Sequence, residues 1–303
     1  MRRVNWNIPA DRRRPPPRTE LVLTIIVFAR YDPDGERWQM VDRARNWIPV
    51  DSFRVEYFLA IDGISAPLIL LNGIVLFGAV LISQTIQYRT RDFFVLLLAL
   101  GSGVFGVFVV RDLFFLFFFY ELAVVPMYLL IGVWGSTTDF RTFIRTKEYG
   151  AMKLTLYLVA GSVLVWVAIL AVYVNAGQGS FLFLDLEQAD YSLSFQRFFF
   201  PMFMVGFGVL AGLWPFHTWS PDGHVAAPTS VSMVHAGVLM KLGAYGVIRS
   251  MGILPEGAED WMPVLIGLGT VNVIYGAVSA MAQRDLKYVV GYSSVSHMGY
   301  VLM

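Results

Sequence analysis

The sequence predicts an all-α fold, a polytopic bundle of transmembrane helices in which one helix is broken. Hydrophobic residues make up 56% of the 303 residues and charged residues 15%, against about 25% charged in an ordinary soluble domain. The charges are spaced widely enough to leave long apolar windows, and a helix needs roughly 20 such residues to cross about 30 Å of hydrocarbon. These windows are continuously apolar, without the alternation that is typical of a membrane β-barrel.

Eight windows are predicted to span the membrane. Residues 68–88, 154–174 and 261–282 contain no charged side chain, and a soluble core helix is rarely apolar on all sides over such a length. The predicted spans are 64–87, 93–110, 113–134, 149–174, 197–219, 226–249, 261–282 and 288 to the end.

The connections between these spans differ in charge. Those after the first, third and seventh spans are basic, and those after the fourth and sixth are acidic. The basic residues are Arg89, Arg91, Arg141, Arg145, Lys147, Arg284 and Lys287; the acidic residues are Asp185, Glu187, Asp190, Glu256, Glu259 and Asp260. The positive-inside rule places the basic connections on the cytoplasmic or matrix side, and the segment before the first span outside.

The two ends of the chain are unusual. Residues 1–20 are basic and proline-rich without an apolar core, so they form neither a signal peptide nor a span, and we expect a disordered tail. Residues 21–63 are predicted to hold the end of a truncated helix and an external segment, and 64–303 the transmembrane bundle. The last span stops at Met303 without a polar exit, and we therefore expect a chain truncated at both ends.

Glu121 is a lone carboxylate near the middle of the third span. An ionised carboxylate at that depth costs roughly 2.5–3.5 kcal/mol, and Pro126 leaves the carbonyl of Leu122 without its helical donor. A structural hydrogen bond to a neighbouring helix would satisfy both groups. A proton relay is the functional alternative, and it is the one we favour.

Lys241 is a second deep charge, thirteen residues after Pro228, where a helix can begin. The structural alternative is a lysine that extends its amine to the membrane surface. Because of its predicted depth, we favour a role in proton transfer.

A third feature is the stretch VLAGLWPFHTWSPDGHVAAPT, residues 209–229. Pro215 and Pro221 each remove a backbone donor, so a regular helix cannot continue through them. Broken spanning helices are tolerated where protein or water satisfies the freed groups, and they mark ion paths in transporters. An ordinary loop with two solvated histidines, His217 and His224, is the alternative; as a metal site their spacing is weak evidence.

Four stretches resemble one family, in the same order. They are WIPVDSFRVEYFLAIDGISAPLILL, YELAVVPMYLLIGVWG, PFHTWSPDGHVAAPTSVSMVHAGVLMKLGAYGVIR and AQRDLKYVVGYSSVSHMGYVLM. Together they are similar to the antiporter-like membrane subunit M (chain 4) family of the proton-pumping NADH:quinone oxidoreductase, respiratory complex I. The resemblance runs from about residue 21 to residue 303. It implies that the spans are the third to tenth of the family's fourteen helices and include the first of two inverted repeats, each with a broken helix.

The resemblance also implies roles for single residues. Glu121 matches the family's glutamate on the fifth helix, Lys241 its central lysine on the eighth, and Lys153 a basic residue on the sixth. Lys287 and His297 match positions at and within the tenth helix.

One departure affects the glutamate. The family pairs it with a lysine five residues before PFH, and Leu210 stands at that position here, with Gly212 where a proline is usual. The resemblance then leaves two readings open. Either water or another base such as His217 replaces the lysine, or the first half-channel is uncoupled.

The resemblance implies a proton-translocating subunit that couples quinone reduction elsewhere in the complex to proton transfer through buried Glu, Lys and His side chains. A subunit of a multi-subunit cation/proton antiporter or of a membrane-bound hydrogenase is an alternative, and so is a non-conducting fragment. The chain has no cysteine, which excludes cysteine-ligated iron–sulfur or zinc sites within it.

We therefore expect no cofactor and no redox chemistry in this chain, with NADH, flavin, iron–sulfur clusters and quinone in partner subunits. The expected partners are other membrane subunits of complex I, especially neighbouring antiporter-like subunits, and the lipid bilayer, with no nucleic acid. The expected location is the bacterial cytoplasmic (inner) membrane.

Overall fold

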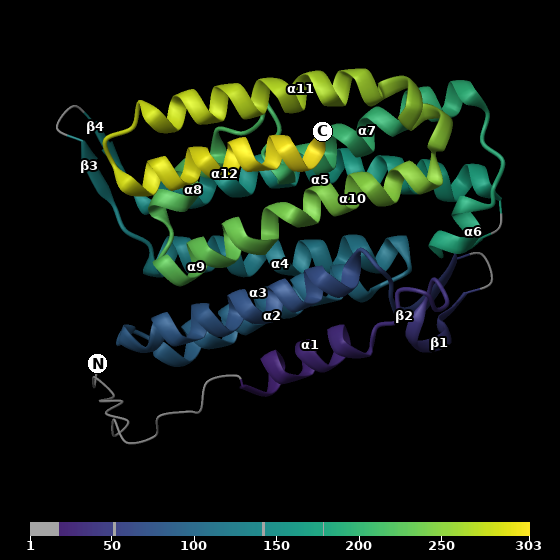
Figure 1. The fold of residues 1–303 in the computed structure, drawn as a ribbon, viewed down its shortest axis with the longest axis horizontal. Helices are drawn as coiled ribbons and strands as arrows, with labels where there is room; N and C mark the ends of the chain where they lie inside the picture. The colour runs from purple at the N-terminus through teal and green to yellow at the C-terminus, as the bar shows by residue number, and fades with distance from the viewer. Residues whose placement is uncertain (1–17, 51–52, 141–142, 178) are drawn as a thin grey trace.

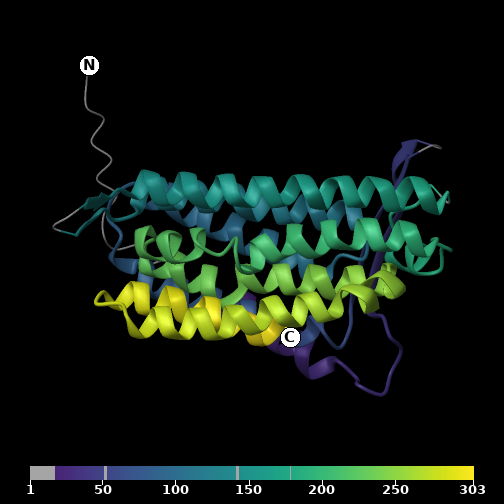
Figure 2. The same ribbon diagram turned by 90° about the horizontal axis from the view of Figure 1, so that it is seen from above.

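The computed structural model describes residues 18–50, 53–140, 143–177 and 179–303, and its long helices run side by side along one direction (Figure 1). Seen from above, the same helices again lie parallel or antiparallel to one another (Figure 2). In the described part of the chain, seven helices are long and apolar enough to cross a membrane. The predicted fold class, a polytopic transmembrane bundle, is confirmed, and the protein is an integral membrane protein.

Most helices follow the predicted apolar windows closely, but the fifth predicted window, 197–219, is a continuous helix only as far as Ala211. The seven long ones are α2 (Ser65–Ile82, continued by the 3-10 turn η1, Ser83–Thr85), α3 (Thr90–Val109), α4 (Leu113–Trp134), α5 (Lys147–Ala176), α7 (Leu193–Ala211), α9 with η2 and α10 (Thr229–Val234, His235–Leu239, Met240–Ile253) and α11 (Pro255–Met281). The eighth predicted span forms the shorter helix α12 (Leu286–Leu302). The remaining helices are α1 (Arg18–Arg30), α6 (Phe183–Glu187) and α8 (Trp219–Ala226).

Polar side chains mark where several long helices begin. Asp112, Thr146, Ser192 and Asp285 each accept a hydrogen bond from a backbone N–H in the first turn of α4, α5, α7 and α12 respectively. The first N–H groups of a helix have no partner within it, and these side chains satisfy one or two of them. The connections therefore set the helix starts, whereas the apolar windows set the helix lengths.

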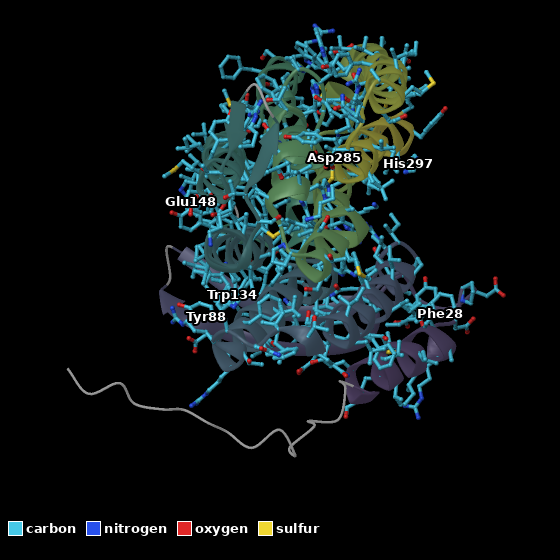
Figure 3. All side chains as sticks on the ribbon, turned by 90° about the vertical axis from the view of Figure 1, so that its left-hand side faces the viewer. Phe28, Tyr88, Trp134, Glu148, Asp285 and His297 are labelled. Carbon is cyan, nitrogen blue, oxygen red and sulfur yellow. The ribbon has the colours of Figure 1, made fainter. Side chains whose placement is uncertain are left out.

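The bundle has two chemically different ends. The connections α2–α3, α4–α5 and α11–α12 lie together at the end that carries β3 and β4, which we call the basic end (Figure 1). The opposite end, which carries α6 and the connection between α10 and α11, is called the acidic end. Figure 3 looks onto the basic end, where the indole N–H of Trp134 donates to the carbonyl of Tyr88 at 2.7 Å.

Two short antiparallel sheets were not predicted. Strands β1 (Gln39–Val50) and β2 (Phe53–Ile61) pair at the acidic end, and β3 (Thr138–Phe140) pairs with β4 (Phe143–Arg145) at the basic end (Figure 1). These strands lie in polar connections, outside the apolar windows on which the prediction rested. A hairpin is marginal alone, and β2 is held by a hydrogen bond of 2.9 Å from Arg111 N to Phe58 O.

The segments before the first span were predicted as a basic tail (1–20) and as a truncated helix with an external segment (21–63). Most of the tail lies outside the described residues; residues 18–20 begin α1, which packs against α2. The rest of this region holds the remainder of α1 and the β1–β2 hairpin.

The predicted break lies between α7 and α8. Helix α7 ends at Ala211 and is followed by Gly212, whose φ of +76° is left-handed, a conformation that glycine adopts without steric cost. The N–H of Leu213 donates back to Gly208 O at 2.8 Å, which closes the helix. Helix α7 also packs tightly on α5, because a Cβ at Gly161 would lie only 2.8 Å from Gly206 O. Small residues permit such close approach of membrane helices.

Candidate functional site

Glu121 lies on α4, and its side chain is partly buried. Its carboxylate accepts a short hydrogen bond from Ser162 Oγ on α5, and the hydroxyl of Tyr120 lies 3.2 Å from the same Ser162 oxygen. Ser162 Oγ also lies 2.9 Å from the carbonyl of Leu158, one turn back on α5. Because Ser162 has one hydroxyl hydrogen, it donates to one of these acceptors at a time, and Tyr120 can donate to Ser162 when Ser162 donates to Glu121. Both hydroxyl-bearing residues are buried. The result is a three-residue chain of exchangeable hydrogens between two helices.

The usual positive partner of this glutamate is absent from the position predicted for it. Leu210 is buried on α7, only 1% exposed, and Glu121 forms no ion pair with any described residue. His217, the predicted substitute base, lies elsewhere. It packs edge-on against Tyr275 of α11, with ring centroids 4.8 Å apart, and neither of its ring nitrogens has a hydrogen-bond partner within the described chain.

A second group of polar side chains surrounds Asp222 on α8, which sequence reasoning did not select. Its Oδ2 accepts hydrogen bonds from Lys153 Nζ at 2.8 Å and from Arg145 Nη1 at 3.1 Å. Its Oδ1 accepts one from the Tyr288 hydroxyl at 2.8 Å. One buried carboxylate thus joins α5, α8, α12 and β4. The signal in the sequence was a single acid directly after Pro221, in the stretch that breaks the helix.

Two buried histidines stack near this group. The rings of His224 on α8 and His235 in η2 are 4.0 Å apart at an angle of 19°. His224 Nδ1 lies 3.0 Å from Ser232 Oγ and its Nε2 lies 3.3 Å from Ser294 Oγ. His235 is fully buried, and its ring nitrogens have no hydrogen-bond partner among the described residues.

Lys241 follows a change in helix type. The five residues of η2, His235–Leu239, form a π-helical turn, and such turns occur frequently at functional sites. The amine of Lys241 donates to the carbonyl of Ala236 in this turn. The side chain is therefore held against its own helix.

The two predicted residues of α12 are in different environments. Lys287 Nζ donates to Val225 O at 3.1 Å and to Ala227 O at 3.0 Å, at the C-terminal end of α8, where a lysine pairs well with unsatisfied carbonyls. His297 is exposed on the outer side of α12 (Figure 3). The structure thus groups Lys153 with Asp222, whereas Glu121, Lys241 and Lys287 each have separate contacts and His297 is exposed.

Backbone groups at the break form hydrogen bonds with a residue that was not selected from the sequence. Asn272 of α11, which is fully buried, accepts a hydrogen bond from Trp214 N at 2.9 Å. Its amide nitrogen donates to Gly212 O at 3.2 Å and to Val295 O at 3.0 Å. The signal available in the sequence was a single side-chain amide within the charge-free window 261–282.

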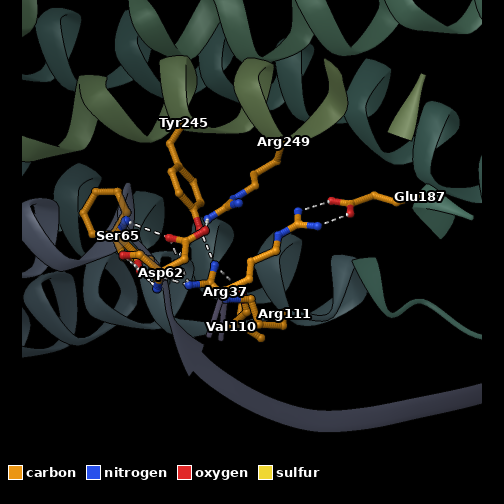
Figure 4. Close-up of polar contacts among 9 residues, drawn as sticks. Arg37, Asp62, Ser65, Val110, Arg111, Glu187, Tyr245 and Arg249 are labelled. Carbon is orange, nitrogen blue, oxygen red and sulfur yellow. Dashed lines mark hydrogen bonds and ion pairs between the residues drawn. The ribbon is translucent and has the colours of Figure 1, made fainter. Parts of the chain in front are cut away.

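An ion network lies at the acidic end, shown in Figure 4. Asp62 accepts a short hydrogen bond from Arg249 Nη2 on α10 and lies 3.4 Å from Arg111 Nη2. Arg111 also donates to the Tyr245 hydroxyl at 2.7 Å and to Ser65 Oγ at 2.9 Å. Burial alone would raise the pKa of Asp62, but the two guanidinium groups hold it below its usual value. This network ties the start of α2 and the α3–α4 connection to α10.

A second carboxylate at this end is not paired with a cation from any residue that the structure describes. Asp112 is fully buried, and its oxygens accept hydrogen bonds from Phe115 N at 3.1 Å and from the backbone N of Glu56 at 3.3 Å. Burial, reinforced by the nearby Glu56 carboxylate, raises the pKa of Asp112 to about 7. The Glu56 side chain is itself paired with Arg43 at 2.6 Å.

Spanning helices around one broken helix, with acidic and basic side chains between them, define the class of antiporter-like membrane proteins. The sequence profile of the NADH:quinone oxidoreductase/Mrp antiporter transmembrane family matches residues 110–303. The chain belongs to this family, as the sequence predicted.

Curated relatives support the same assignment. The chain is 40% identical over 278 residues to NAD(P)H-quinone oxidoreductase chain 4 3 of Picosynechococcus sp., covering 91% of this chain and 48% of the relative. It is 37% identical over 284 residues to NAD(P)H-quinone oxidoreductase chain 4 of Gloeobacter violaceus, covering 93% and 52%. The chain spans about half the length of the curated relatives it matches.

Solved structures share the fold. A chain of respiratory complex I from Thermus thermophilus with bound NADH matches with a TM-score of 0.79 and 25% identity, covering 92% of this chain and 56% of that one. A chain of the membrane-bound sulfane sulfur reductase, an archaeal respiratory membrane complex, matches with a TM-score of 0.74 at 22% identity. At that identity, the second match shows the fold alone.

Proposed function

We propose that this chain is a proton-translocating membrane subunit of an NADH:quinone oxidoreductase. Glu121, Lys153, Lys241, Lys287, His217 and His297 are the residues proposed to carry or steer protons, and quinone reduction in partner subunits supplies the energy. NADH, flavin, iron–sulfur clusters and quinone are proposed to be bound by those partners. The family, and relatives named as chain 4 of such enzymes, support the proposal.

The observation that carries the proposal is the Tyr120–Ser162–Glu121 chain on α4 and α5. A carboxylate in a spanning helix is costly, and such residues commonly mark proton relays. Here its hydrogen-bond partner can pass on a hydrogen. Ser162 is nine residues beyond Lys153 on α5, or roughly 14 Å along the axis at 1.5 Å per residue. Proton transfer between the two groups therefore requires intervening water or a further side chain.

Glu121 also supports the proposal of a neighbouring membrane subunit. Its face of α4 carries exposed apolar side chains, with Phe118 50%, Leu122 37% and Val125 59% exposed. Charged residues within membrane spans rarely face lipid. We propose that an adjacent antiporter-like subunit covers this face, in a bacterial cytoplasmic membrane with the basic end inside.

The test is Glu121→Gln in the complete assembly, reconstituted in vesicles. Glutamine keeps the hydrogen bond from Ser162 but cannot exchange a proton at neutral pH, so proton uptake per NADH oxidised should fall. The matched control is Glu148→Gln, an exposed carboxylate at the start of α5 (Figure 3), which should leave uptake unchanged. Undiminished uptake in Glu121→Gln, with the subunit present in the assembly, would contradict the proposed function.

A further inference from the structure

A small pocket opens at the basic end, between the start of α5, α8 and α12. Its volume is about 10 Å³, close to the minimum that holds one water molecule. Ser136, Arg145, Tyr149, Asp222 and Tyr288 are among its lining residues. It therefore joins the aqueous side of the basic end to the Asp222 carboxylate.

The groups around Asp222 lie at different depths. Arg145 precedes α5 and has a side chain that is 34% exposed, whereas the Asp222 side chain is 9% exposed. Lys153 is six residues beyond the first residue of α5, roughly 9 Å into the helix at 1.5 Å per residue. Asp222 thus bridges a surface cation and a cation two turns inside.

The two cations differ in what they can do. A guanidinium does not lose its proton in a protein, whereas a lysine amine can be deprotonated when its surroundings favour it. Both contact the same oxygen, Asp222 Oδ2. Arg145 can therefore only block or expose that oxygen, while Lys153 can give up a proton and accept another.

We infer that protons from the basic side enter this chain at the Asp222 carboxylate, which we call the port. Arg145 is its latch, meaning the cation that blocks or exposes Asp222 Oδ2. Lys153 is the first residue to accept the proton from Asp222. After Lys153 passes its proton inward, it is a neutral amine. A hydronium ion in the pocket protonates the Asp222 carboxylate and leaves water, and the carboxylic acid then transfers that proton to Lys153. The step ends with the carboxylate and ammonium that the structure shows. This inference rests on the proposed function, and it adds the residues of the entry.

The path beyond Lys153 is suggested by its neighbour one turn on. The Tyr157 hydroxyl, on α5, lies 3.2 Å from Thr218 Oγ1, at the break before α8.

The alternative is that Asp222 is a staple, meaning a purely structural contact that holds α5, α8 and α12 together. This alternative predicts no change in water access when Arg145 is removed.

Access can be measured directly, because the chain has no cysteine. Val225 lines the pocket and is only 3% exposed. Val225→Cys therefore places a thiol at the buried wall of the pocket, and labelling of this subunit by a membrane-impermeant thiosulfonate is followed in the complete assembly. We expect labelling from the basic side, several-fold faster when Arg145→Ala is added. Gln87→Cys, exposed in the α2–α3 connection at the same end, is the control and should label at one rate in both backgrounds. An unchanged Val225→Cys rate would overturn the latch.

Proton uptake tests the port itself. Asp222→Asn should lower uptake per NADH oxidised, and Asp222→Glu, which keeps an exchangeable carboxylate, should restore most of it. Tyr288→Phe removes a contact to the same carboxylate but no proton carrier. If Asp222 were only a staple, the contact between the helices would be weakened in Tyr288→Phe as much as in Asp222→Asn. Equal uptake in Asp222→Asn and the unsubstituted assembly, while Glu121→Gln loses uptake, would overturn the port and leave the proposed function standing. Loss of uptake in neither variant would overturn both.

Discussion

At the scale of single residues, three of the charges selected from the sequence are held by hydroxyls or carbonyls, and none of the three forms an ion pair with a described residue. Glu121 has Ser162, Lys241 has the Ala236 carbonyl, and Lys287 has two carbonyls of α8. Replacing the family lysine by Leu210 leaves Glu121 with a neutral partner that can rotate and exchange hydrogen. A relay through hydroxyls can therefore operate at this position without the usual ion pair.

Asp112 gives a residue-scale prediction. A carboxyl group whose folded pKa is raised contributes stability that is fully present below its unfolded pKa and lost as pH rises through the folded value. The shift from 3.8 to about 7 corresponds to roughly 4 kcal/mol at most, lost as the pH rises from about 4 to 8. Asp112→Asn keeps an effective helix cap and should flatten the fall in the thermal unfolding midpoint over that range, measured in detergent.

One control variant makes this prediction specific. Asp92→Asn alters an exposed carboxylate at the basic end that is paired with Arg89, and it should retain the pH dependence of the original chain. The same slope in Asp112→Asn and the original chain would contradict the assignment of the raised pKa to Asp112.

At the scale of elements, the broken helix is stable because α11 supplies the missing hydrogen bonds. Asn272 contacts the backbone of Gly212 and Trp214, where the break begins, and that of Val295 on α12. Orphaned buried backbone groups cost roughly 1–3 kcal/mol each. The break is therefore a built feature of the bundle.

Asn272→Leu should consequently destabilise the chain by several kcal/mol, because about three backbone groups lose their partner at roughly 1–3 kcal/mol each. The measurement is the midpoint of thermal unfolding in detergent. The control is Thr270→Val on the same helix. Thr270 donates to the carbonyl of Ile266, one turn back in its own helix, so this substitution should change the midpoint little. Equal midpoints for the two variants would show that the break does not depend on Asn272.

The elements also show how far sequence reasoning reaches. The helices were predictable because a bilayer requires long apolar runs, and α4 begins and ends at the predicted residues. The hairpins were not, because their stability depends on packing against distant connections. Asp222 was missed for a similar reason: its partner Lys153 lies 69 residues away, and nothing in the local sequence of either residue shows that they meet.

At the scale of the whole molecule, the chain presents two chemically distinct ends. The acidic end is fixed by Asp62, Arg111 and Arg249 (Figure 4), whereas the basic end carries the pocket above Asp222. Between them lie η2 and the break, the two irregular backbone segments nearest the histidines and Lys241. Movement of protons in this bundle would thus begin at a hydrated end and proceed past segments whose backbone geometry departs from an ordinary α-helix.

The most direct test of this account is the number of protons taken up per NADH oxidised by vesicles that contain the complete assembly with Lys241→Met. Methionine keeps most of the side-chain volume but cannot accept or release a proton, so the account predicts a lower ratio with the subunit still assembled. Arg91→Gln, an exposed charge at the basic end, should keep the original ratio. An unchanged ratio in Lys241→Met would contradict the claim that protons cross this chain through its buried charges.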